Sequence, residues 1–143
     1  MSDLVVTVPK TIWFEWIAEG DGVGEPASGE EWAYWVSAAR PPIEPGDRLY
    51  VVAWGMLRGY APVTRVAMGD HGRYGICRRG EAVACTVKGG RWDGFRGYRK
   101  RWWMREQEVP FPTWKTENIP GRQVALAIER GALSPSELRS EVP

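Results

Sequence analysis

The segment from residue 88 to residue 105 combines aromatic rings and positive charge in a way that suits contact with a polyanion. It carries seven basic residues against one acid, Asp93, although the 143-residue chain has a formal net charge of only +1. Aromatic faces stack on nucleobases, while Lys and Arg side chains neutralise phosphates. We therefore predict a nucleic-acid interface formed by Arg91, Trp92, Arg96, Tyr98, Arg99, Lys100, Arg101 and Trp102.

The same segment has a second interpretation. Residues 10–31 carry six acids against one lysine. This region could lie beside the basic segment and neutralise its positive charge. The rings could then complete the core while the arginine stems lie along it. Gly94 and Gly97 argue against a stable helix here and favour a loop that adapts to its partner.

A second group of residues could hold a small flat ligand. The chain has nine tryptophans, and such a surplus indicates either a ring-rich core or a stacking site. Gly55 would let a ligand approach the backbone closely, and an arginine inside an apolar strand needs an acceptor. The predicted ligand-binding residues are Trp35, Trp54, Arg58 and Tyr60, with core packing as the alternative for Trp54.

Residues that could perform catalysis are sparse. The chain has no phosphate-binding glycine loop, nucleophile elbow or zinc-protease motif, and its one histidine, His71, lies in a polar loop. Lys10 followed by Thr11 could activate a nucleophile, with Glu15 or Glu19 doing acid–base work. These residues are the candidate catalytic group, and the sequence leaves open whether the chain is an enzyme.

No metal or cofactor is indicated. Cys77 and Cys85 lie eight residues apart, and a single histidine cannot complete a zinc site with them. If their strands pair, the two thiols could face each other across a hairpin, but we expect reduced core cysteines. The sequence also lacks an apolar run of about 18 residues, so we expect a cytoplasmic protein with no membrane partner.

The positions of apolar residues, prolines and glycines predict the elements that carry these groups. Short strands are expected over residues 3–9, 32–39, 48–54 and 55–67, and a hairpin over 72–87 turning at Arg79-Gly80. The strand over 32–39 alternates, with Trp32, Tyr34 and Val36 on one face and Ala33, Trp35 and Ser37 on the other. Helices are expected over 10–20, 121–131 and 134–140. The expected fold is α+β: a small mixed or antiparallel β-barrel over residues 1–118, with peripheral helices, and a helical C-terminal extension over 119–143.

The order of these segments resembles the PUA-like superfamily, which includes the ASCH, EVE and YTH domains. The resemblance rests on "PKTIWFEWIAEGD", on "PPIEPGDRLYVVAWG" with its Pro-Gly-Asp turn, and on "LRGYAPVTRVA". It covers residues 4–87, and the segment up to residue 114 could complete the barrel. It implies a pseudo-barrel whose cleft receives RNA or DNA, often with one modified or flipped-out base between aromatic walls.

The resemblance also implies an enzymatic alternative. Some ASCH domains are ribonucleases or amidohydrolases of acylated cytidine that use a Lys, a Thr and a Glu, for which Lys10, Thr11 and Glu15 are the loose counterparts. Here Pro9 precedes the lysine, where the family usually has glycine. The helices from residue 121 onward lie outside the resemblance and could dock a protein partner, which would make the chain a protein-interaction module.

Overall fold

The first strand forms because "LVVT" is a run of apolar and β-branched residues that ends before a proline. In the computed structural model, which describes residues 2–37 and 39–135, this strand lies between two others. It pairs in parallel with one strand and antiparallel with another, and Leu4, Val5 and Val6 are all buried. A strand buried on both faces is a central element, and the rest of the sheet is built around it.

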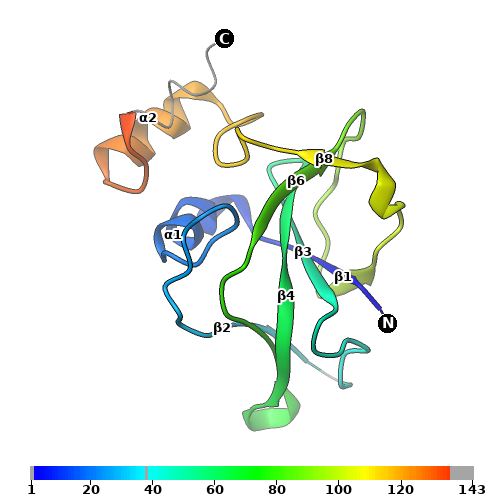
Figure 1. The fold of residues 1–143 in the computed structure, drawn as a ribbon. Helices are drawn as coiled ribbons and strands as arrows, with labels where there is room; N and C mark the ends of the chain where they lie inside the picture. The colour runs from blue at the N-terminus through cyan, green and yellow to red at the C-terminus, as the bar shows by residue number, and fades with distance from the viewer. Residues whose placement is uncertain (1, 38, 136–143) are drawn as a thin grey trace.

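Eight strands form a mixed sheet. They are β1 Leu4–Thr7, β2 Trp32–Val36, β3 Arg48–Ala53, β4 Met56–Met68, β5 Tyr74–Arg78, β6 Val83–Val87, β7 Tyr98–Lys100 and β8 Glu108–Pro110. The order along the main path is β2-β5-β4-β3-β1-β7, while β6 pairs with β4 and β8. The sheet curls into a half-barrel (Figure 1), and β2 and β7 are the two ends of its main path.

Strands β3 and β4 are the two strands predicted on either side of Gly55, and they pair antiparallel. The turn holds Trp54 and Gly55, which both have positive φ, at 52° and 74°, as a two-residue hairpin turn requires. The Pro45-Gly46-Asp47 turn before β3 is also present. There the Asp47 carboxylate accepts hydrogen bonds from the backbone N–H groups of Glu44 and Ser2.

The hairpin predicted over residues 72–87 is wrong. β5 pairs with β2 and β4, whereas β6 pairs with β4 and β8. The long strand β4 is the reason, because its two halves offer separate ladders to β5 and β6. Cys77 and Cys85 therefore do not face each other across a hairpin, and both are buried free thiols, in agreement with the reduced state that the sequence predicts.

The helix predicted over residues 10–20 is shorter and begins differently. A 3₁₀ turn covers Lys10–Ile12, and α1 covers Trp13–Ala18. Thr11 lies inside this turn, and Ile12 is the residue that directly precedes α1. The second helix, α2, covers Gly121–Glu129, and Gly131 follows in the left-handed conformation. The helix predicted over 134–140 lies, beyond its first two residues, outside the described part of the chain.

Two apolar clusters lie on opposite faces of the sheet. The larger one gathers Leu4, Val6 and Val51 with Trp13 of α1 and Trp114. The smaller one gathers Val5 and Tyr50 with aromatic rings of the 92–103 segment. Within the described ranges, no helix is both long and apolar enough to cross a bilayer.

Candidate ligand-binding site

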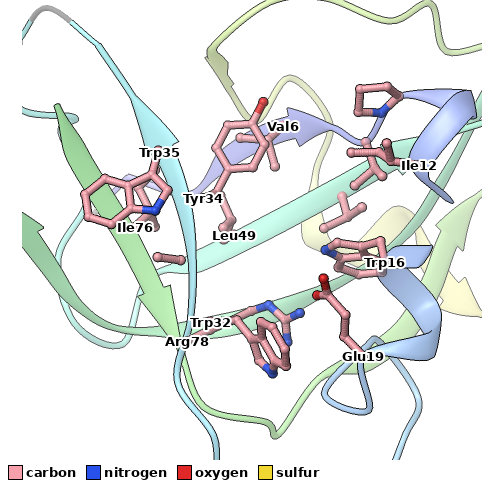
Figure 2. A pocket seen from close by; sticks show the side chains of 14 residues that line it. Val6, Ile12, Trp16, Glu19, Trp32, Tyr34, Trp35, Leu49, Ile76 and Arg78 are labelled. Carbon is pink, nitrogen blue, oxygen red and sulfur yellow. The ribbon is translucent and has the colours of Figure 1, made fainter. Parts of the chain in front are cut away.

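A cavity of about 260 Å³ opens on the concave face of the half-barrel. Its floor is apolar and is made by alternate residues of the central strands, including Val6 of β1, Leu49 and Val51 of β3 and Ile76 of β5. Ile12 and Trp16 come from the turn before α1 and from α1 itself, and they close one side (Figure 2). The cavity therefore depends on the curl of the sheet, which brings β2 over β1 and β3.

Strand β2 supplies the aromatic wall opposite α1. In its antiparallel pairing with β5, Trp32 lies opposite Arg78, and Tyr34 lies opposite Ile76. Directly opposed residues point to the same face of a sheet, so Trp32 and Tyr34 face the cavity, as Figure 2 shows. The sequence alternation that placed these two residues on one face is thus confirmed.

The cavity becomes polar at the end formed by α1 and the last residue of β5. Here Arg78 is only 7% exposed, and its guanidinium carbon lies 5.3 Å from the centroid of the Trp16 ring. Its Nη1 donates a hydrogen bond to the carbonyl oxygen of Asp21. Burial lowers the pKa of Arg78, although the nearby carboxylates of Asp21 and Glu19 oppose that effect.

Glu19 is the acidic group at this polar end. Figure 2 shows its carboxylate extending from the end of α1 toward the same region as the Arg78 guanidinium. Partial burial raises the pKa of Glu19, and the positive charge of Arg78 works in the other direction. The Glu19 carboxylate, an acceptor, and the Arg78 guanidinium, a cationic donor, thus lie beside aromatic rings. Such a combination of polar and aromatic groups can bind a flat polar ring.

The structure does not bring the four predicted ligand-binding residues together. Trp35 borders the cavity, but its indole lies on the other side of β2 from Tyr34 (Figure 2). It packs over Gly69 and Gly75 and under the guanidinium of Arg73, 4.9 Å from the ring centroid. The prediction that Trp35 stacks on a ligand from within a shared cleft is therefore not supported by its position.

Arg58 and Tyr60 are held by contacts with other residues of the protein. Arg58 is fully buried, and its guanidinium donates hydrogen bonds to the carbonyl oxygens of Ala53 and Trp114. These are the acceptors that an arginine in an apolar strand requires, and they belong to the protein rather than to a ligand. Tyr60 packs against Tyr50 on the smaller cluster, with Arg48 over its ring.

Trp54 lies in a second cavity of about 520 Å³, lined also by Lys10, Arg91 and Asn118. The Lys10 Nζ lies 5.0 Å from the centroid of its ring. A positive φ is unusual for so bulky a residue, and neighbouring groups hold the turn in place. The Asn118 side-chain amide donates to the Trp54 carbonyl oxygen, and the backbone N–H of Trp92 donates to that of Gly55.

The side chains of residues 88–105, the aromatic–basic segment, are divided between the core, the surface and ion pairs. Trp92 and Trp103 are buried in the smaller cluster, while Trp102 packs against both of them and remains 52% exposed. Arg101 forms an ion pair with the buried Asp3 carboxylate. The core interpretation therefore holds for Trp92, and Arg101 is engaged by the protein itself.

The remaining predicted interface residues are separated by the register of β7. Tyr98 lies opposite Val6, and Lys100 lies opposite Leu4, so both side chains share the face that holds the cavity. Arg99 points to the other face, where it lies 4.4 Å from the centroid of the Phe95 ring. Arg91 borders the second cavity, and Arg96 is exposed in the turn before β7.

The acidic segment, residues 10–31, does not form ion pairs with the basic residues of the 88–105 segment in the part of the chain that the structure describes. Among the described residues, its ion pairs join Glu31 to Arg65 and Arg79, and Glu25 to Lys115. The ion-pair partners of the basic segment are Asp3 and Asp93 instead. The exposed cations Lys100 and Arg96 therefore keep their charge available for an anionic partner.

The candidate catalytic residues share a third cavity. Lys10, Thr11 and Glu15 line a groove of about 340 Å³ between α1 and α2, together with Gln123 and Arg130. Glu19 does not line this groove, because it lies on the side of α1 that faces the first cavity. The sequence prediction thus placed the two glutamates in one group that the fold separates.

Sequence reasoning missed Trp32, Tyr34 and Arg78 as site residues. The alternation of β2 gave the signal for the two rings, but the strand that lies opposite them is set by long-range pairing. Comparisons of the chain with protein-family models, with curated proteins and with solved structures found no match.

Proposed function

We propose that this protein binds single-stranded nucleic acid and holds one unstacked base in the cavity on the concave face of the half-barrel. The observation that carries the proposal is the grouping of Trp16, Trp32 and Tyr34 around a cavity whose polar end contains Glu19 and Arg78. Aromatic walls accept the face of a base, while the polar groups bind its edge.

The size of the cavity supports a single ring system. Sites for drug-sized ligands measure about 300–1,000 Å³, and this cavity, at about 260 Å³, lies just below that range. A base must leave its stack to enter, and this step is least costly in a single strand. A single-stranded partner therefore suits the cavity better than a duplex.

Strand β7, which pairs with β1, offers contacts for the sugar–phosphate backbone of such a nucleic acid. Tyr98 and Lys100 on β7 lie on the same face as the cavity floor, because they pair with Val6 and Leu4. Lys100 is exposed and can neutralise a phosphate. The single-stranded nucleic acid would then run along β7 while one of its bases turns into the cavity.

The proposal includes the finer assignment of the fold to the PUA-like superfamily. A curled mixed sheet with a helix after its first strand and a Pro-Gly-Asp turn before β3 supports that assignment. In such domains the cleft receives a modified or flipped-out base. The aromatic walls of the cavity are suited to that use.

The decisive experiment compares two tryptophans of β2 that point in opposite directions. Binding of a fluorescent single-stranded oligonucleotide is measured by anisotropy for the wild type, Trp32→Ala and Trp35→Ala. Loss of one base–aromatic contact costs about 1–3 kcal/mol, so Trp32→Ala should weaken binding about fivefold to a hundredfold. Trp35→Ala, on the opposite face, should bind as the wild type does. Equal effects of the two variants, or no binding by the wild type, would contradict the proposal.

A second candidate is an ASCH-like hydrolase of acylated nucleosides. The observation that favours it is that Lys10, Thr11 and Glu15 line one groove between α1 and α2. It predicts release of acetate from N4-acetylcytidine that is lost in Lys10→Ala, while the melting temperature is unchanged. No release by the wild-type protein across a panel of acylated cytidines would remove this candidate.

A further inference from the structure

The polar end of the cavity presents an acceptor and a donor that a ligand can engage together. Among the described residues, the Glu19 carboxylate has no hydrogen bond or ion pair, and the one hydrogen bond of the Arg78 guanidinium joins it to the Asp21 carbonyl oxygen. Arg78 is more than nine-tenths buried, so its other N–H donors have little access to bulk water. Both residues line the cavity that also contains Trp16 and Trp32.

Resting on the proposed function, we infer that the cavity selects guanine. The Watson–Crick edge of guanine carries two adjacent donors, N1–H and the N2 amino group, which match the two oxygens of the Glu19 carboxylate. The neighbouring carbonyl O6 is an acceptor for the Arg78 guanidinium. A carboxylate offers only acceptors and a guanidinium offers only donors, so this edge satisfies both residues at once.

Each of the other bases satisfies fewer of the hydrogen-bonding atoms of these two residues. Adenine has one amino group beside the N1 acceptor, so it leaves one Glu19 oxygen without a donor, and uracil or thymine has a single N–H between two carbonyl oxygens that a carboxylate repels. Cytosine supplies acceptors for Arg78 but only one amino group for Glu19. Hydrogen bonds to charged groups contribute about 1.5–3 kcal/mol each, so the loss of one bond lowers affinity by about tenfold to a hundredfold.

The test uses thymidine pentanucleotides whose central position is guanine, hypoxanthine, adenine, cytosine or an abasic site. Hypoxanthine is guanine without the N2 amino group, so it reports on that contact alone. We expect the guanine oligonucleotide to bind tightest, with the hypoxanthine one about tenfold weaker or more. In Glu19→Gln the difference between these two should shrink, because glutamine keeps only one acceptor oxygen in place of two.

The control is Glu30→Gln, which removes an exposed carboxylate of the same acidic segment and should keep the wild-type preference. Equal binding of guanine and hypoxanthine by the wild type, or tighter binding of another base, would overturn the guanine inference. If Trp32→Ala still weakened binding in that case, the proposed function would stand. If no oligonucleotide bound the wild type, both would fall.

Discussion

Lys100 lies directly opposite Leu4 in the antiparallel pair of β7 and β1. Leu4 belongs to the larger apolar cluster that also contains the cavity floor, so the register places the Lys100 side chain on the concave face. Its neighbour Arg99 lies opposite Val5, which belongs to the smaller cluster on the other face. Two adjacent cations thus point to opposite sides of the sheet.

This relationship predicts that the two cations differ in their contribution to binding. Lys100→Ala should weaken oligonucleotide binding and reduce the slope of log K against log salt by about 0.7, the value for one phosphate of a single strand. Arg99→Ala removes the same charge from the other face and should leave the slope unchanged. Anisotropy titrations at several salt concentrations measure both, and equal slopes for the two variants would contradict the assignment.

The ionisation of Glu19 predicts a pH dependence of binding. Partial burial raises the pKa of Glu19 above its ordinary value of 4.5, and only the ionised carboxylate accepts two hydrogen bonds from guanine. Affinity for the guanine oligonucleotide should therefore be full at neutral pH and fall as pH drops through this raised pKa. Glu19→Gln should lack this dependence. A wild-type affinity for guanine that stays constant down to pH 4.5 would argue against contact with Glu19.

The packing of Trp35 predicts a steric effect at Gly75. A Cβ at Gly75 would lie 3.0 Å from the Trp35 ring, so Gly75→Ala forces the indole to move. Overpacking of this kind costs about 1–3 kcal/mol of unfolding free energy. Combining it with Trp35→Ala removes the clash, and the double variant should be no less stable than Trp35→Ala alone. Urea denaturation of the wild type, the two single variants and the double variant measures these free energies of unfolding. If the losses of the two single variants simply added in the double variant, the contact between Gly75 and Trp35 would be contradicted.

The buried carboxylate of Asp3 predicts a stability difference that depends on pH. Burial by itself raises the pKa of Asp3. The backbone N–H of Arg48, which donates a hydrogen bond to it, and the side chains of Arg105 and Arg101 outweigh burial and lower that pKa below 3.8. The ionised form therefore stabilises the fold above pH 3.8, and this contribution is lost as pH falls through the lowered folded-state pKa.

Replacement of this carboxylate gives the measurement. Asp3→Asn should lower the free energy of unfolding at pH 7 by about 1–3 kcal/mol, since it weakens hydrogen bonds to charged groups. The gap from the wild type should narrow as the pH is lowered below 3.8. Urea denaturation at several pH values tests this, and a gap that is constant with pH would show that the charge of Asp3 does not contribute.

The amino-acid sequence by itself determined the local elements. The β-branched run of β1, the alternation of β2, the apolar run of β3 and the helix α2 all appear where the pattern predicts them. These features depend on neighbouring residues, whose periodicity and turn chemistry are visible along the chain. The division of β2 into a face with Trp32 and Tyr34 and a face with Trp35 followed from the same rule.

Only the tertiary structure decided which of these faces meet. Arg78 faces the cavity because β5 pairs with β2. The sequence pattern had predicted that β5 forms a hairpin with the next strand, β6. The aromatic–basic segment is rich in both kinds of side chain, but its register against β1 leaves Tyr98 and Lys100 on the cavity face and buries Trp92 elsewhere. Pairing between distant strands depends on burial across the whole sheet, and a shift of one residue would exchange the two faces.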